Sequence, residues 1–273
     1  MDTVRKTDYE VIICTCEKFS DLWDANILLL NRNFPERGKT FLATDFPTGR
    51  IFEKVTVVSA GEGAKITGRI SAALSESSAE YILLCLEDYF LTEPVEDRKI
   101  REAIGFMEEE KIDYLRLYGA SERYLRREGA RESGKYKGFW LRNISEGSYK
   151  ISLYPGIWRR DFLLSTLGKE LDPWEYEVSL TEYARSFGAK CAISCRGEFP
   201  FLDVIRKGKI LRKAARYFQK NPIYSGNREK TGFFEEFLLD FRTFLRRNLP
   251  APLFLILKYI MMKLGMKFYS PLE

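Results

Sequence analysis

The sequence contains no histidine in its 273 residues. That absence excludes a Ser-His-Asp triad, a Cys-His dyad, a zinc site with histidine ligands and a histidine general base. Acid–base chemistry in this chain would therefore depend on carboxylates, tyrosine, lysine or thiols. A bound metal ion would most readily be a hard cation held by oxygen atoms.

Cysteine is scarce, and its spacing does not suit a metal site. No CxxC pair occurs, and four of the five cysteines lie in apolar runs typical of strands. The five are Cys14, Cys16, Cys85, Cys191 and Cys195. This placement favours buried free thiols in a reducing compartment, with a disulfide or a metal site as the alternative. The first ten residues also lack the apolar core of a signal peptide, so we expect a cytoplasmic protein.

Charge is distributed unevenly along the chain. The formal net charge is only +5, but residues 205–273 hold 15 basic and 5 acidic residues, a local charge of +10. The preceding 204 residues hold 29 basic and 34 acidic residues, a charge of −5. We therefore predict two domains, a folded body of residues 1–204 and a basic helical appendage of residues 205–273.

Short apolar runs alternate with amphipathic stretches in the first half of the chain. Strand-like runs cover residues 9–16, 39–44, 55–59 and 81–86, with helical patterns between them at 21–33 and 66–75. This alternation predicts an α/β fold, a mostly parallel sheet flanked by helices. Ligands of such sheets bind beyond the carboxyl ends of the strands. The charged stretch 121–137 is expected to form a surface loop.

Two adjacent carboxylates, Glu87 and Asp88, directly follow the apolar run 81–86. Burying both charges costs free energy unless something uses them. One such use is a Mg²⁺ ion that bridges them to a diphosphate, because Mg²⁺ takes one or two carboxylates together with substrate phosphates. Taken alone, the pair is equally consistent with helix capping or with pairing to arginine.

Residues 61–89 resemble the signature of GT-A glycosyltransferases, particularly the large inverting family 2. Ala64-Lys65 matches the Ala-Arg step of that signature, Glu80-Tyr81-Ile82 matches the start of the strand, and Glu87-Asp88 matches the acidic DxD motif. The resemblance implies a GT-A-like fold with a donor half of about residues 1–118 and an acceptor half of about residues 119–204. It also implies a nucleoside-diphosphate sugar, with a UDP-sugar favoured, and a divalent cation, Mg²⁺ or Mn²⁺, at Glu87 and Asp88.

Two positions depart from the family pattern. Ile66 stands where the family usually has asparagine, and Tyr89 stands where a third acidic residue is common. These departures leave open a donor site that functions without a metal ion.

The resemblance also assigns donor contacts at the ends of the first two strands. Thr15, Cys16 and Glu17 occupy the place where the family holds the nucleotide base and ribose, and Asp45 suits a contact to either. Backbone and hydroxyl groups can bond a base edge, and a carboxylate accepts from ribose hydroxyls. Lys65, at a helix start, could oppose the diphosphate charge. It could equally be a solvated lysine of the first turn.

An aromatic-rich stretch and a Pro-Trp-Glu-x-Glu segment resemble the acceptor side of bacterial polysaccharide glycosyltransferases. The resemblance assigns the catalytic base to Glu177 or Glu175, and a carboxylate is the natural choice in a chain without histidine. Aromatic rings stack on sugar rings, so Tyr154, Trp158 and Trp174 are candidate acceptor contacts. The alternative is that both glutamates only complement the dipole of a helix that begins there.

The C-terminal appendage combines apolar and basic residues. Lys258, Lys263 and Lys267 interrupt its apolar run before the ~20 residues that a membrane-spanning helix needs. Such a helix suits the interface of an anionic membrane, which predicts peripheral association with the inner face of the cell membrane. Packing on the body or oligomerisation is the alternative, and nucleic-acid binding is not expected because no reading motif is present.

Together these features predict a glycosyltransferase of cell-surface polysaccharide synthesis that acts on a glycan or lipid-linked acceptor, and the inverting form is expected. Glu177 would deprotonate the acceptor, while Asp88 and Glu87 would stabilise the leaving nucleoside diphosphate. Two alternatives remain. One is a catalytically inactive scaffold of a membrane glycan-assembly complex. The other is a nucleotidyltransferase, against which residues 15–19 count because they contain no glycine.

Overall fold

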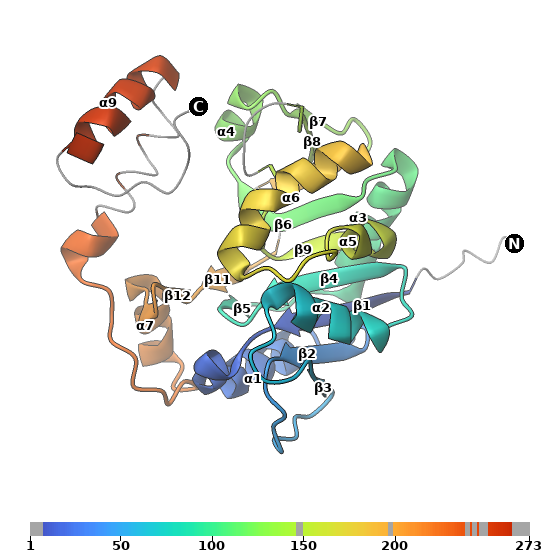
Figure 1. Ribbon diagram of the computed structural model, residues 1–273, viewed down its shortest axis with the longest axis vertical. Coiled ribbons are helices and arrows are strands. Elements are labelled where there is room, and N and C mark those ends of the chain that lie inside the picture. The colour runs from blue at the N-terminus through green and yellow to red at the C-terminus, as the bar shows by residue number, and fades with distance from the viewer. Residues whose placement is uncertain are drawn as a thin grey trace, which may run out of the picture.

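The computed structural model describes residues 8–145, 150–195, 199–237, 241, 245 and 251–263. Lys267 of the predicted membrane-binding tail lies outside these residues. Within them, a nine-stranded sheet forms the centre of the molecule (Figure 1). Its strand order is β3 (Thr56–Ser59), β2 (Thr40–Thr44), β1 (Tyr9–Cys14), β4 (Tyr81–Leu86), β9 (Gly156–Arg159), β6 (Tyr114–Ala120), β10 (Cys191–Cys195), β8 (Phe139–Arg142) and β7 (Arg131–Glu132).

Most strands of this sheet point in the same direction, and β9 and β8 run opposite to the others. β3, β2, β1 and β4 pair in parallel, and β6 pairs in parallel with β10. β9 is antiparallel to both of its neighbours, and β8 is antiparallel to β10 and β7. The prediction of an α/β fold with a mostly parallel sheet is therefore confirmed.

Helices cover both faces of the sheet, which explains why its central strands are apolar along their whole length. One face packs against α1 (Trp23–Asn33), which follows a 3₁₀ helix η1 (Glu17–Leu22), and against α3 (Asp97–Glu110). The other face packs against α2 (Ile66–Ser75), α5 (Arg160–Ser165) and α6 (Pro173–Phe187), which cross the front of the sheet in Figure 1.

The stretch predicted as a surface loop, residues 121–137, contains regular structure instead. Ser121 caps a short helix, α4 (Glu122–Arg127), through its hydroxyl, which accepts from the Tyr124 amide at 3.4 Å. Leu125 of this helix is fully buried, and β7 follows it at the edge of the sheet. The loop prediction was wrong because one apolar residue and one cap are enough to anchor a helix whose other residues are charged.

A third buried cluster joins the N-terminal and C-terminal parts of the chain. It combines Leu22, Ala25 and Leu29 with residues 202–218. The elements involved are β5 (Tyr89–Leu91), β11 (Phe201–Asp203), β12 (Ile205–Arg206), β13 (Lys209–Ile210) and α7 (Arg212–Lys220). Packing thus continues across position 204, where a domain boundary was predicted, and that boundary stays a prediction.

The last described element is α9 (Ala251–Lys263), a helix of 13 residues. None of the helices in the described part of the chain has both the length and the hydrophobicity to cross a bilayer.

Candidate functional site

The predicted donor residues meet at one edge of the sheet because β1, β2 and β4 pair in register. Cys14 lies opposite both Ala43 and Leu86, so the residues that follow these strands leave the sheet at the same level. The Glu17 amide donates to Asp45 Oδ1 at 2.8 Å, which joins the ends of β1 and β2 directly. The structure therefore brings these residues together at one edge of the sheet, and their role in binding a donor stays a prediction.

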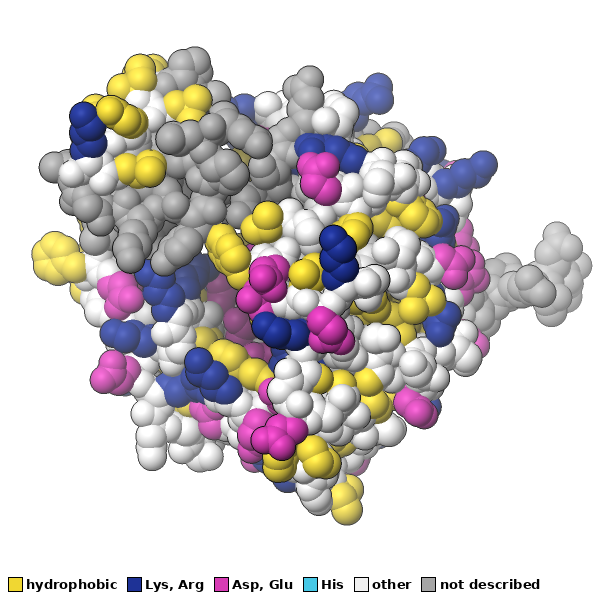
Figure 2. Space-filling view, viewed as in Figure 1, with side chains coloured by type: hydrophobic (Ala, Val, Ile, Leu, Met, Phe, Trp, Pro, Cys, Tyr) yellow, Lys and Arg dark blue, Asp and Glu magenta, His cyan; other side chains and the backbone are white. Residues whose placement is uncertain are grey.

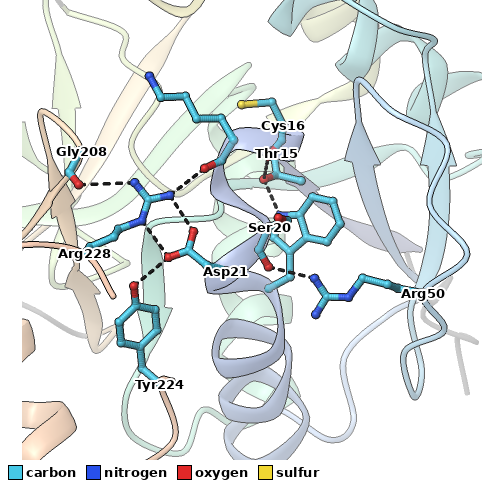
Figure 3. A network of polar contacts seen from close by, with 10 residues as sticks. Thr15, Cys16, Ser20, Asp21, Arg50, Gly208, Tyr224 and Arg228 are labelled. Carbon is cyan, nitrogen blue, oxygen red and sulfur yellow. Dashed lines mark hydrogen bonds and ion pairs between the residues drawn. The ribbon is translucent and has the colours of Figure 1, made fainter. Parts of the chain in front are cut away.

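Thr15 is buried at the end of β1 and is held from two sides. Its hydroxyl accepts from Trp23 Nε1 at 2.7 Å, and its carbonyl accepts from Arg69 Nη1 at 2.7 Å. Cys16 follows as a partly exposed residue at the start of η1 (Figure 3). The backbone that would face a nucleotide is thus fixed by α1 on one face of the sheet and by α2 on the other.

Arg69 is a buried cation that the sequence analysis missed. It lies on the buried face of α2, and its charge opposes that of Glu87 at the end of β4. Burial raises the pKa of Glu87 to about 7, while the Arg69 charge and a hydrogen bond with Thr15 act in the opposite direction. An arginine among the small apolar residues of a helix beside an acidic motif was the signal that could have revealed this pairing.

Asp88 follows Glu87 and has a carboxylate oxygen without a partner in the described part of the chain. Its Oδ1 atom is buried and has no hydrogen-bond partner among the described residues. Burial raises its pKa well above the ordinary value, and the charges of Glu87 and Asp203 add to the effect. A buried carboxylate oxygen without a partner marks a position where a cation or a donor group is missing.

The surroundings of Asp88 fit a divalent cation only in part. Among the described residues no group of three or more acidic or cysteine side chains could hold a metal ion. The chain therefore offers Asp88, with Glu87 next to it, rather than a complete ligand cage. That arrangement suits Mg²⁺ or Mn²⁺ when substrate phosphates complete the coordination.

A second acidic residue, Asp203, reaches the site from a distant part of the chain. Its strand β11 pairs antiparallel with β5, which places Asp203 opposite Tyr89, and the Val204 amide donates to the Asp88 carbonyl at 2.9 Å. Arg206 pairs with Asp203 at 2.8 Å. Figure 2 shows acidic side chains in a hollow near the middle of one face of the molecule, with cationic side chains beside it.

Three tyrosines form a ring cluster next to Asp88. Tyr118 and Tyr154 are stacked with their centroids 4.9 Å apart, and Tyr89 meets both edge-on at 5.5 and 5.6 Å. The Arg116 guanidinium lies 4.0 Å from the Tyr154 ring centre, and its Nε donates to the Tyr118 carbonyl. Tyr154 was predicted as an acceptor contact, whereas Tyr118 and Arg116 were not.

The side chain of Glu177 lies close to this tyrosine cluster. Its Oε1 accepts from the Leu153 amide at 3.3 Å, and the residue is partly buried. Burial raises its pKa, while the Leu153 N–H and the charge of Arg116 lower it. Arg116 thus acts on both Glu177 and Tyr154, which places the predicted base beside the predicted acceptor contact.

The second candidate base, Glu175, has a structural partner. Asp172 accepts from the Trp174 and Glu175 amides at 2.9 Å, and Glu175 Oε2 accepts from the Asp172 amide at 3.0 Å. This reciprocal pair is a capping box that begins α6. The exposed Glu175 carboxylate is therefore accounted for by the helix start.

The three remaining predicted residues differ in accessibility. Trp174 is 48% exposed at the start of α6, and Lys65 is exposed at the N-cap of α2. Trp158 is fully buried in β9, where it packs against Tyr114 and Phe162. Its ring has no face open to an acceptor, because β9 lies in the interior of the sheet and is covered by α5.

Tyr224 and Arg228, from the C-terminal part of the chain, contact η1 (Figure 3). Arg228 binds Asp21 through two nitrogens, at 2.8 and 2.6 Å, and also donates to the Lys18 carbonyl at 2.7 Å. The Tyr224 hydroxyl donates to Asp21 at 2.7 Å. The positive charge of Arg228 lowers the pKa of Glu87, so the basic part of the chain helps to stabilise the negative charge of the acidic motif.

No protein-family model matches this chain, and no curated protein matches it. Some solved structures are distantly similar to it. Residues 1–349 of S. aureus TarS in complex with UDP-GlcNAc are 16% identical, with a TM-score of 0.49 over 74% of this chain and 60% of that one. A longer TarS structure is 12% identical, with a TM-score of 0.46 over 74% of this chain and 37% of TarS. This chain thus spans about two fifths to three fifths of the length of these TarS chains.

A CMP:2-keto-3-deoxy-manno-octonic acid synthetase complexed with CTP is 13% identical, with a TM-score of 0.41 over 72% of this chain and 93% of that one. The bifunctional IspDF from Campylobacter jejuni is 12% identical, with a TM-score of 0.41 over 70% of this chain and 50% of that one. Likenesses this distant define neither a family nor an activity for the chain.

Proposed function

We propose that this protein transfers a sugar from a nucleoside-diphosphate donor, with a UDP-sugar favoured, to a hydroxyl of a glycan or lipid-linked acceptor. The observation that carries the proposal is the buried, unpartnered oxygen of Asp88 at the end of β4. It lies at the sheet edge where β1 and β2 also end, which is where ligands of parallel α/β sheets bind. Synthesis of a cell-surface polysaccharide is the process that such an acceptor implies.

On the donor side, hydrogen bonds hold the backbone at the strand ends in place, and charged side chains lie close to it. Thr15, Cys16 and Glu17 lie at the strand end where the base and ribose would bind, Thr15 is held there by Arg69, and Asp45 is held next to them by the Glu17 amide. Lys65 is exposed at the start of α2, where it can face the diphosphate. Asp88, with Glu87 beside it, would hold Mg²⁺ or Mn²⁺, which supplies Lewis-acid stabilisation of the leaving diphosphate.

On the acceptor side, Glu177 takes the proton. Its raised pKa makes it a stronger base than an ordinary glutamate. As the acceptor oxygen forms its bond to the anomeric carbon, the hydroxyl proton passes to the Glu177 carboxylate and the bond from that carbon to the diphosphate breaks. One displacement of this kind inverts the anomeric centre. Tyr118, Tyr154 and Trp174 offer ring faces on which an acceptor sugar can stack.

Thermal unfolding with a panel of nucleoside-diphosphate sugars, with and without Mg²⁺ or Mn²⁺, tests this proposal. A donor present at about 100 times its Kd should stabilise the folded protein by about 2.7 kcal/mol. Stabilisation by one donor and loss of that effect in Asp88→Asn would support the donor site. If no nucleotide-sugar stabilises the wild-type protein, the chain is a scaffold with this fold rather than a transferase. Release of diphosphate from a nucleoside triphosphate would instead identify a nucleotidyltransferase.

The proposal includes a location: the protein is cytoplasmic and binds peripherally to the inner face of the membrane. A transferase acting on a lipid-linked acceptor has to meet that acceptor at the membrane surface. The residues that could make this contact are considered next.

A further inference from the structure

Residues 233–237 form a helical segment whose charged side chains face the protein and whose apolar side chains face solvent, the reverse of an ordinary surface helix. Its acidic residues face the body of the protein. Glu236 accepts from the Thr231 hydroxyl at 3.2 Å and pairs with Arg212 at 3.9 Å, and Glu235 pairs with Lys209 at 3.6 Å. These contacts fix the orientation of the segment against β13 and the start of α7.

The phenylalanines of the same segment face outward. Their exposed fractions are 62% for Phe233, 76% for Phe234 and 53% for Phe237, and Phe241 is 43% exposed. Phe233, Phe237 and Phe241 stack along one side, with centroid distances of 6.4 and 6.0 Å. Soluble proteins rarely leave several neighbouring aromatic rings in water, so this row calls for an apolar partner.

Cations lie next to this aromatic row. The Arg212 guanidinium is 5.1 Å from the Phe233 ring centre and connects the row to α7. Further along α7, Lys213, Arg216 and Lys220 line an open groove of about 530 Å³ together with Tyr217 and one acidic residue, Glu93. No ion pair is recorded for these three cations within the described part of the chain.

We propose that the aromatic row Phe233, Phe234, Phe237 and Phe241 inserts into the interface of an anionic lipid bilayer, while Lys213, Arg216 and Lys220 bind its headgroups. The charge of the region favours a bilayer over an apolar protein groove, because unpaired cations gain energy next to anionic lipids. Phenylalanine rings enter the boundary between headgroups and acyl chains, which requires no spanning helix. α9 adds further exposed apolar residues, among them Leu253, Ile256 and Ile260. This proposal does not depend on the chemistry assigned to Asp88.

Co-sedimentation of the full chain with vesicles tests the proposal. Phosphatidylcholine vesicles containing phosphatidylglycerol should bind the protein, whereas pure phosphatidylcholine should bind it weakly, and added salt should reduce the binding. The triple variant Phe233→Ser/Phe234→Ser/Phe237→Ser should weaken binding at least about tenfold. The control Leu28→Ser/Ile51→Ser changes exposed apolar residues elsewhere and should bind like the wild type.

The cationic part is tested separately. Changing Lys213, Arg216 and Lys220 to glutamine should weaken binding to anionic vesicles about 100-fold. The control Lys99→Gln/Lys137→Gln/Lys169→Gln removes the same charge from exposed positions outside the surface and should have a much smaller effect. Equal losses in the two triple variants would show a response to net charge only and would overturn the assignment of α7.

The variant Phe234→Trp keeps an aromatic ring and avoids any defect in folding. Its added fluorescence should shift to shorter wavelength with anionic vesicles and be quenched by lipids brominated on their acyl chains. Absence of vesicle binding by the wild type, or of quenching in this variant, would overturn the proposal. If the serine variant instead converts a dimer to a monomer in sedimentation velocity, the aromatic row is an interface between two copies of the chain.

Discussion

The donor and acceptor sides of the candidate site are held together in different ways. On the donor side, parallel strands end in register, and buried polar contacts from Trp23 and Arg69 fix the backbone of Thr15. On the acceptor side, the cluster around Tyr118 and Tyr154 depends on ring packing. A backbone held by hydrogen bonds on both sides is preorganised, whereas a ring cluster can repack around different sugars. The comparison teaches that the proposed donor side is held more rigidly than the proposed acceptor side.

The strongest test of the acceptor side is Glu177→Gln. Loss of the base should lower kcat about 10²–10⁴-fold while leaving donor affinity unchanged. Transfer assays and calorimetry with the donor measure the two quantities separately.

The matched control for that test is Glu175→Gln. Glutamine preserves the capping box at the start of α6, so this variant should keep both its thermal stability and its turnover. If Glu175→Gln loses turnover and Glu177→Gln does not, the base has been assigned to the wrong glutamate.

On the donor side, Asp88→Asn should lower turnover about 10²–10³-fold, because the stabilisation of the leaving diphosphate is lost. The assay is transfer or donor hydrolysis at saturating donor. Asp161→Asn, which changes an exposed acid on α5, should leave turnover unaffected. Near-normal turnover of Asp88→Asn would remove this carboxylate from the reaction.

Glu87 should make the stability of the protein depend on pH. Its pKa is raised from 4.5 to about 7, so the folded state keeps a proton that the unfolded state releases. The resulting stabilisation is complete below pH 4.5 and is lost as the pH rises through about 7. Glu87→Gln should flatten the pH dependence across this window by up to about 3 kcal/mol.

Urea unfolding of both proteins at about pH 5 and about pH 7.5 measures that difference. Parallel changes in the two proteins would show that Glu87 is already ionised in the folded state. The donor side would then be less buried than its contacts indicate.

The smallest expected effect concerns the ring cluster. Tyr118→Leu should raise the KM for the acceptor about three- to tenfold, because one stacking face is lost. Tyr118→Phe keeps that face and should behave like the wild type. A change in donor KM instead would place Tyr118 on the donor side and break the proposed division.

The parts of the site that sequence patterns predicted are the local ones. Thr15, Asp45 and Asp88 each follow a recognisable apolar strand, and parallel pairing brings strand ends together without further information. Asp203 and Arg206 could not be found in this way, because the pairing of β11 with β5 joins distant parts of the chain. The expectation that Trp158 faces an acceptor failed for the same reason. β9 lies inside the sheet because it pairs with β4 and β6, and local sequence patterns do not reveal that pairing.

The contact between Arg228 and Asp21 has a consequence for synthesis on the ribosome. The sheet is completed only when β10 has emerged to lie between β6 and β8, and η1 receives its partner later still. A nascent chain that ends before residue 228 therefore carries the acidic motif without one of the cations that balance it. The strands of the proposed donor side are therefore synthesised early, but a product truncated before residue 228 would lack part of the charge balance around Glu87.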